Sequence, residues 1–281
     1  MSSDSKIAKA ASLLLHSPPG EVDDVFNGKQ DIRGIVNDDE ALQEHIEPVL
    51  AESNMQQFLA TTVPNTDSRV LITPYNRVGD MEFFDPNSCT VFTFDHLHRT
   101  AHDAAPWTAP EDAQQHEPLR QALYDELSLY VQAHYADGSL GVFWHEGALV
   151  SCVVSNRFSP SNFWNGSWRS MWSFDPQSGQ LNGSTKVRVH YFEDGNVQLD
   201  TQTDFAADVE DMDDSVRAKR VAKLIRGFEA EFQQSIGDGY RQLAEKTFKG
   251  LRRSLPVTRS RMDWDKVANY TIGGELANAE A

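Results

Sequence analysis

Two hydrophobic periods follow one another along this chain, and they limit the folds open to it. Between residues 139 and about 205 the apolar side chains recur every second residue, as where Trp168, Trp172 and Phe174 alternate with Arg169 and Ser173. This period is typical of half-buried antiparallel strands. A turn signal at residues 193–196 then leads into a further apolar strand. The pattern predicts a meander of about five strands with one face that must be covered.

The covering element follows directly in the sequence. From about Ser215 to Leu251 the apolar residues form one stripe of a helix roughly 50 Å long, at about 1.5 Å per residue. The stripe consists of Val221, Leu224, Ile225, Phe228, Phe232, Ile236, Tyr240, Leu243, Phe248 and Leu251. Pro256 cannot continue a helix and ends it. We therefore expect an α+β fold in which a long helix lies across an antiparallel sheet.

The other segments differ in character. Short amphipathic helices are expected in the N-terminal part, with a break at Ser17-Pro18-Pro19-Gly20. Prolines then punctuate short extended pieces, of which 70–72 and 91–94 are the clearest strands. We divide the chain into a helical part (1–60), an irregular globule with short strands (61–117), a helix plus the sheet (118–206), the long helix (207–255) and a C-terminal amphipathic segment (256–281).

The net charge is −17, yet one segment is basic. Residues 249–266 carry a local charge of +4, and the remainder carries −21. The six cations of this segment are Lys249, Arg252, Arg253, Arg259, Arg261 and Lys266. So acidic a chain is not expected to bind nucleic acid in general or to adhere to anionic membranes without specificity. The basic segment is either an interaction site or a solvated helix end that complements the helix dipole.

The residues that carry catalytic chemistry form no convincing site. The sequence has no phosphate-binding loop, no nucleophile elbow and no zinc-protease helix motif. His96, His98 and His102 form the most metal-like cluster, but no spaced ligand completes it, so ordinary histidines are favoured over a metal site. We expect a binding protein with no cofactor and no enzymatic activity.

Two further groups have alternative interpretations. Cys89 and Cys152 make no disulfide framework, which favours two buried thiols in a reducing compartment. No apolar run approaches 18 residues, and we expect a cytoplasmic protein. The cluster of Trp164, Trp168 and Trp172, with Phe163 beside it, could stack bases or sugars. The two-residue period of Trp168, Trp172 and Phe174 instead favours a place in the core.

Several blocks of the sequence resemble a known family. Three blocks resemble the alpha subunit of the heterodimeric F-actin capping protein. They are FWNGSWRSMW (163–172), VHYFEDGNVQL (189–199) and FKGLRRSLPVTRSRMDW (248–264). The likeness runs from about residue 7 to 276. It implies an obligate beta subunit of similar fold, and for each subunit a helical stalk, an irregular globule, a five-stranded half of a shared sheet, a long helix and an amphipathic C-terminal tentacle.

The resemblance also implies a function. The family caps the barbed end of actin filaments independently of calcium and blocks both addition and loss of subunits. The implied actin-binding residues are Lys249, Arg252, Arg253, Arg259, Arg261, Trp264 and Lys266. Lys249, Arg253 and Arg259 are also the implied site at which polyphosphoinositides inhibit capping. Capping regulators are further implied partners, and cortical actin is the implied location.

The chain departs from the family pattern near its end. Val267-Ala268 is smaller than the Ile-Leu pair expected there, and Gly274 stands where a lysine often follows the glycine. These departures favour a weaker tentacle. The alternative hypothesis is a phosphoinositide-responsive adaptor of the same fold with weakened actin binding.

Overall fold

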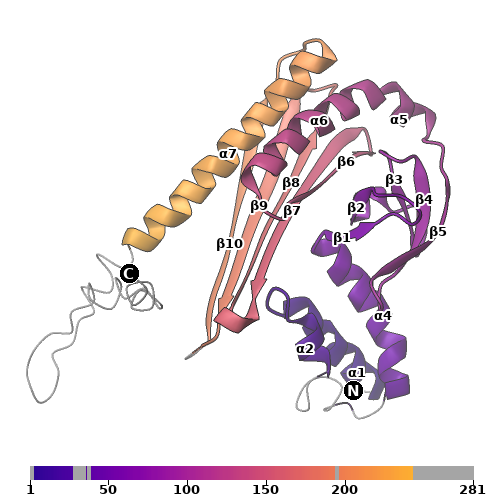
Figure 1. The fold of residues 1–281 in the computed structure, drawn as a ribbon, viewed down its shortest axis with the longest axis vertical. Helices are drawn as coiled ribbons and strands as arrows, with labels where there is room; N and C mark the ends of the chain where they lie inside the picture. The colour runs from indigo at the N-terminus through magenta and orange to yellow at the C-terminus, as the bar shows by residue number, and fades with distance from the viewer. Residues whose placement is uncertain (1–2, 28–35, 37–38, 194–195, 243–281) are drawn as a thin grey trace, which may run out of the picture. The chain divides into compact units, whose positions relative to one another are not determined.

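The computed structural model describes residues 3–27, 36, 39–193 and 196–242 (Figure 1). The chain divides into two compact units, Met1–Arg226 and Gly227–Ala281. The described part of the second unit is the C-terminal portion of one helix. The first unit contains every strand and all the other helices of the described ranges.

The N-terminal stalk is helical, as expected. Its described helices are α1 (Ser3–Ser12), the 3-10 helix η1 (Leu13–His16), α2 (Val22–Asn27) and α4 (Asp39–Gln56). These helices share a small apolar core because each presents aliphatic residues at helical spacing. The buried members of that core are Ile7, Ala11, Leu14, Val22, Ile46 and Leu50.

Two small antiparallel sheets form the globule. Strands β1 (Leu59–Thr62) and β2 (Arg69–Ile72) make a pair, and β3 (Glu82–Asp85), β4 (Thr90–Asp95) and β5 (Thr100–Pro106) make a three-stranded sheet. The strands expected at 70–72 and 91–94 lie within β2 and β4. A core rich in phenylalanine joins the two sheets, formed by Val63, Val70, Ile72, Phe83, Phe92 and Phe94.

A five-stranded antiparallel meander dominates the first unit, which confirms the main expectation. Its strands are β6 (Ser139–His145), β7 (Ala148–Ser159), β8 (Trp164–Phe174), β9 (Gln180–Tyr191) and β10 (Val197–Asp208). Each strand pairs with the next along the chain, so the spatial order is β10-β9-β8-β7-β6. The 3-10 helices η2 (Pro74–Asn76) and η3 (Pro160–Asn162) precede β3 and β8.

Helices line one face of the sheet. They are α5 (Glu111–Gln115), α6 (Glu117–His134) and, in the first unit, the part of α7 (Asp214–Gln242) that ends at Arg226 (Figure 1). Tyr135, just after α6, has its ring centroid 6.0 Å from that of Trp168 on β8, and Arg226 of α7 lies 5.6 Å from the Tyr130 ring centroid. In the first unit α7 buries Ala218, Val221, Ala222 and Ile225. The expected long helix is thus present, and its continuation to residue 251 lies outside the described residues.

The stalk and the globule pack on the opposite face. A buried cluster joins Leu71 of β2 to Val150, Cys152 and Val154 of β7. Near the distal ends of the strands, the Glu21 Oε1 atom accepts a hydrogen bond from Asn165 Nδ2 at 3.0 Å and lies 2.6 Å from His190 Nδ1. The Arg188 guanidinium donates to the Ser17 carbonyl at 3.0 Å. The helix break predicted at residues 17–20 therefore also attaches the stalk to the sheet.

One expectation about the cysteines is wrong. Cys152 is buried in the sheet, but Cys89 is exposed in the turn between β3 and β4, with a φ of 50°. The turn forms because the Asp85 carboxylate accepts hydrogen bonds from the backbone N–H groups of Asn87 and Ser88.

The three histidines of the metal-like cluster do not converge. His98 Nδ1 lies 2.7 Å from Asp95 and His102 Nδ1 lies 2.8 Å from Asp103, both at exposed positions. His96 is buried, and its ring meets those of Phe83 and Phe94 edge-on. Within the ranges described, no group of three His, Cys, Asp or Glu residues could hold a metal ion.

Burial of His96 gives stability a pH dependence. Burial, reinforced by Arg77 and opposed by Asp95, lowers the pKa of His96 to about 4. The unfolded chain takes up this proton near pH 6.5, so stability is lost as pH falls from about 6.5 to about 4. We expect His96→Gln to remove about 2 kcal/mol of the difference in unfolding free energy between pH 7 and pH 4.5.

Urea unfolding at the two pH values measures this difference. His98→Gln, at an exposed neighbouring position, serves as the control and should keep the wild-type dependence. An unchanged dependence in His96→Gln would contradict the assignment.

Candidate functional site

The residues expected to bind actin or phosphoinositides lie outside the described residues. This applies to Lys249, Arg252, Arg253, Arg259, Arg261, Trp264 and Lys266. Their roles remain predictions from the sequence. The part of the chain that the structure describes offers a different surface for interaction, the outer edge of the five-stranded sheet.

The two edges of this sheet are unlike. Strand β6 lies next to β2, η2 and α6, and its first five residues are buried. Strand β10 has twelve residues, all exposed or half-buried, and among the described strands it pairs with β9 alone. One side of β10 therefore presents a row of backbone N–H and C=O groups about 40 Å long, at about 3.3 Å per residue.

An aromatic stack anchors this edge on the helix-bearing face. Trp172 of β8, Gly183 of β9 and Phe205 of β10 are in register. The rings of Trp172 and Phe205 are stacked, with centroids 5.7 Å apart and planes 19° apart. A Cβ atom on Gly183 would lie 2.1 Å from the Trp172 ring. Gly183 thus lets the indole cross β9 and reach the edge strand.

The side chains of β10 alternate between the two faces. Every second residue from 199 to 207 is half-buried and lies on the same face as Trp172, whereas the intervening residues are exposed. The half-buried residues are Leu199, Thr201, Thr203, Phe205 and Ala207. On the opposite, stalk-facing side of the sheet, Asp200 forms ion pairs with Lys186 at 3.2 Å and Arg188 at 3.4 Å. These pairs link β10 to β9 across the ladder.

The edge can act by pairing rather than by chemistry. A long strand with free backbone groups is a template for another strand, and natural proteins cover such an edge or pair it. None of the helices in the described ranges is long and apolar enough to cross a membrane. The fold and its open edge define a class of protein, a sheet-forming subunit with an edge available to a partner.

Comparison with known proteins specifies the family. A model of the F-actin capping protein alpha subunit matches residues 10–275. The chain is 36% identical to the F-actin-capping protein subunit alpha of Caenorhabditis elegans over 278 residues, covering 96% of this chain and 97% of that one. It is also 36% identical to the corresponding subunit of Gibberella zeae over 276 residues, with 98% of each covered. The chain belongs to the family of F-actin capping protein alpha subunits.

A solved structure has the same fold. The homodimeric actin capping protein alpha subunit from Plasmodium berghei superposes with a TM-score of 0.71 at 23% identity, covering 87% of this chain and 94% of that one. This likeness confirms the α+β fold with its five-stranded sheet and long helix. The family is non-enzymatic and serves actin capping in the cytoskeleton, which confirms those two expectations.

The sequence located the aromatic core but missed the role of Gly183. Trp172 and Phe174 are buried, as their two-residue period predicted, and Trp168 is half-buried beside Tyr135. A glycine inside a strand pattern is itself a signal of a close approach by another group. Its partner, Trp172, could not be identified before the strand register was known.

Filling the space at Gly183 should loosen the edge strand. We expect Gly183→Ala to lower the unfolding free energy by about 1–3 kcal/mol, because the new methyl group displaces the Trp172 ring. Urea unfolding followed by tryptophan fluorescence measures the change. Gly227→Ala is the control, since its Cβ meets nothing within 4 Å and a helical alanine is favoured over glycine. Equal stability of the two variants would contradict the role of Gly183.

Proposed function

We propose that this chain is the alpha subunit of a heterodimer that caps the barbed ends of actin filaments and blocks both addition and loss of subunits. The observation that carries the proposal is the family match over residues 10–275, which spans the stalk, the sheet, the long helix and the basic segment. Capping needs no hydrolysis and no calcium in this proposal, because it consists of occupying the filament end.

In the proposed heterodimer the beta subunit pairs with the open edge of β10. A partner strand would satisfy the outer backbone groups of β10 and would extend the sheet. It would also cover the half-buried side chains of Leu199 and Phe205 and the 64% exposed Val197. The Plasmodium berghei alpha subunit is a homodimer, so a second alpha chain is the alternative partner to be tested.

The pairing predicts that the alpha chain depends on its partner. Expressed alone, it should aggregate, whereas co-expression with a beta subunit should give a soluble 1:1 complex, because pairing covers the β10 edge. Light scattering after size exclusion measures the outcome. A monodisperse alpha monomer would contradict edge pairing, and a stable alpha homodimer would replace the beta subunit with a second copy.

Matched variants test the face of β10 that the partner covers. Thr203→Lys puts a charge on the helix-bearing face and should weaken pairing about tenfold or more, since that charge loses water in the complex. Gln202→Lys, on the exposed face, is the control and should pair nearly as well as wild type. Size exclusion of the co-expressed subunits over a dilution series measures both affinities.

The basic segment is the proposed contact with actin. Pro256 divides its cations into two groups of three. The first group, before the proline, is Lys249, Arg252 and Arg253. The second group, around Trp264, is Arg259, Arg261 and Lys266. Clustered cations on a chain of net charge −17 would steer it towards an acidic filament end within a Debye length of about 8 Å. Burial of Trp264 would then slow dissociation, because aromatic residues dominate the binding energy of interfaces.

Single-filament elongation assays test this division of roles. Replacing Lys249, Arg253 and Arg259 with alanine should slow association with barbed ends about tenfold or more and flatten its salt dependence. Truncation after Leu255 should mainly speed dissociation. Alanine at Lys219, Arg220 and Lys223 removes three exposed cations of α7 and is the charge-matched control. Equal losses in the control would show that total charge acts rather than the basic segment.

Regulation by polyphosphoinositides is proposed at the same three cations. Lys and Arg pair with phosphate groups, so lipid headgroups would compete with actin for Lys249, Arg253 and Arg259. Capping regulators are further proposed partners, and cortical actin in the cytoplasm is the proposed location. Vesicle binding that falls with salt, together with normal capping, supports this regulation; vesicle binding without capping would favour the adaptor alternative.

A further inference from the structure

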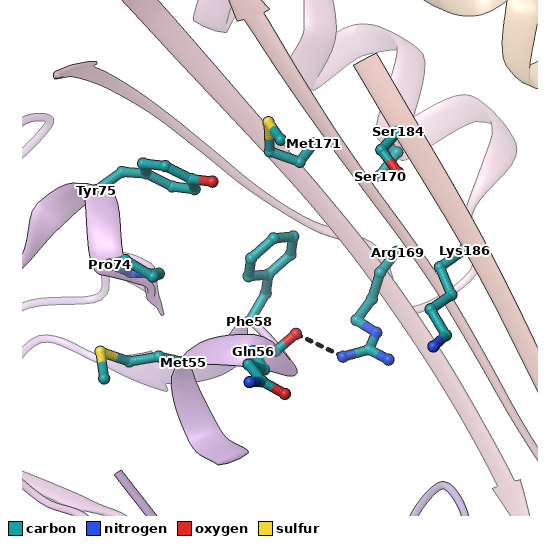
Figure 2. Close-up of a pocket in the computed structure, with 10 residues that line it drawn as sticks. All are labelled: Met55, Gln56, Phe58, Pro74, Tyr75, Arg169, Ser170, Met171, Ser184 and Lys186. Carbon is teal, nitrogen blue, oxygen red and sulfur yellow. Dashed lines mark hydrogen bonds between the residues drawn. The ribbon is translucent and has the colours of Figure 1, made fainter. Parts of the chain in front are cut away.

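A second feature, a cavity, lies on the stalk-facing side of the sheet, on the face opposite to the aromatic stack. Its volume is about 320 Å³, and it lies between strands β8 and β9 on one side and the end of α4, Phe58 and η2 on the other. Figure 2 shows its lining, with Met55, Phe58 and Tyr75 on one side and Arg169 and Lys186 on the other. This volume is at the small end of the range for ligand-binding cavities in proteins, about 300–1,000 Å³.

The sheet side of the cavity has an excess of positive charge. Arg169 and Lys186 project from neighbouring strands and lie side by side, and their Cα positions are paired in the β8–β9 register (Figure 2). Arg188 is the next cation along the same face of β9. One carboxylate, Asp200, pairs with Lys186 and Arg188. Two of these three cations therefore share one acid, on a chain that is otherwise strongly acidic.

Arg169 has no carboxylate of its own in the part of the chain that the structure describes. Its hydrogen-bond partner is the Gln56 carbonyl, which accepts from Nη1. Burial, together with repulsion from Arg188, lowers the pKa of Arg169 to about 10. The guanidinium stays charged at neutral pH. A bound anion would favour its charged form and so offset the lowering of the pKa by burial and by Arg188.

The opposite wall is apolar and carries a polar group that can point at a ligand. Phe58 and Met55 supply the apolar surface, with Pro74 beside them, and Met171 adds to it from β8 on the sheet side (Figure 2). The half-buried Tyr75 hydroxyl makes no hydrogen bond to any residue in the described ranges, and Figure 2 shows it directed into the cavity. Burial raises the pKa of Tyr75, so the hydroxyl remains a donor at neutral pH.

We propose that this cavity binds a small amphiphilic anion, with a carboxylate or phosphate head on Arg169 and Lys186 and an apolar body against Phe58 and Met171. The guanidinium suits a two-oxygen head, because its planar N–H groups match carboxylate and phosphate geometry. A bound ligand would join Phe58, which follows α4, to strands β8 and β9. It would therefore stabilise the attachment of the globule to the sheet.

Titration of the purified heterodimer with phenyl phosphate and with 3-phenylpropionate, followed by ligand-observed NMR, tests the site. We expect saturable binding with a Kd below about 1 mM for at least one of them. Inorganic phosphate and benzyl alcohol, which each lack one half of the ligand, should bind at least about tenfold more weakly. The stronger of the two probes identifies the head group as phosphate or carboxylate. Equal binding of inorganic phosphate, or no saturable binding of either probe, would overturn the proposal.

Variants locate the site. Lys186→Gln should weaken binding of the preferred probe about tenfold, because it removes one charged contact and leaves the Arg169–Gln56 hydrogen bond intact. Arg169→Gln should weaken it at least as much. Lys219→Gln, an exposed cation on α7, is the matched control and should bind like wild type.

The basic segment could also bind phosphate, so it needs its own control. The triple alanine variant at Lys249, Arg253 and Arg259 should retain probe binding while losing fast capping. If that variant loses the probe and Lys186→Gln retains it, the cavity proposal fails and the basic segment is the anion site. Because capping is measured separately, this outcome leaves the proposed function intact.

Discussion

The outer edge of β10, which no other strand of the described residues pairs with, is the constraint on which the rest of this structure depends. A strand of twelve residues that pairs with one described neighbour is costly to expose and prone to misassembly. Trp172 stacks on Phe205 across Gly183, and Asp200 pairs with Lys186 and Arg188. These contacts fix the edge strand on β9 from both faces, so that it is presented in one register. The edge strand is therefore already ordered, as the proposed pairing requires.

The sheet is also the element that holds the stalk and the globule in place. The Ser17 carbonyl accepts a hydrogen bond from Arg188 of β9. The Glu21 carboxylate contacts Asn165 of β8 and His190 of β9. Arg188 thus contributes both to the attachment of the stalk and to the ion pairs of the edge. Strands β8 and β9 connect the proposed partner surface, the stalk and the cavity around Arg169. Perturbation of these two strands should consequently affect several properties at once.

Different physical forces serve the two proposed interactions. Pairing at β10 relies on backbone hydrogen bonds and apolar burial, which give a stable interface that is insensitive to salt. The proposed contact with actin would rely on the cations of residues 249–266, whose attraction acts at longer range and weakens as the salt concentration rises. The net charge of −17 also disfavours unspecific contact between the acidic body of the chain and other acidic surfaces.

The sequence by itself determined the order and type of the main elements. Three local patterns predict these elements. The alternation of period two predicts the sheet, and the long apolar stripe predicts α7. The break at Ser17-Pro18-Pro19-Gly20 divides the helices before β1. The blocks rich in tryptophan also pointed to the family. Only the tertiary structure decided that His96 is buried and Cys89 exposed, that Gly183 makes room for Trp172, and that Arg169 and Lys186 share a cavity. Each of these depends on which residues from distant segments meet, and a periodic pattern contains no information about strand register or packing between segments.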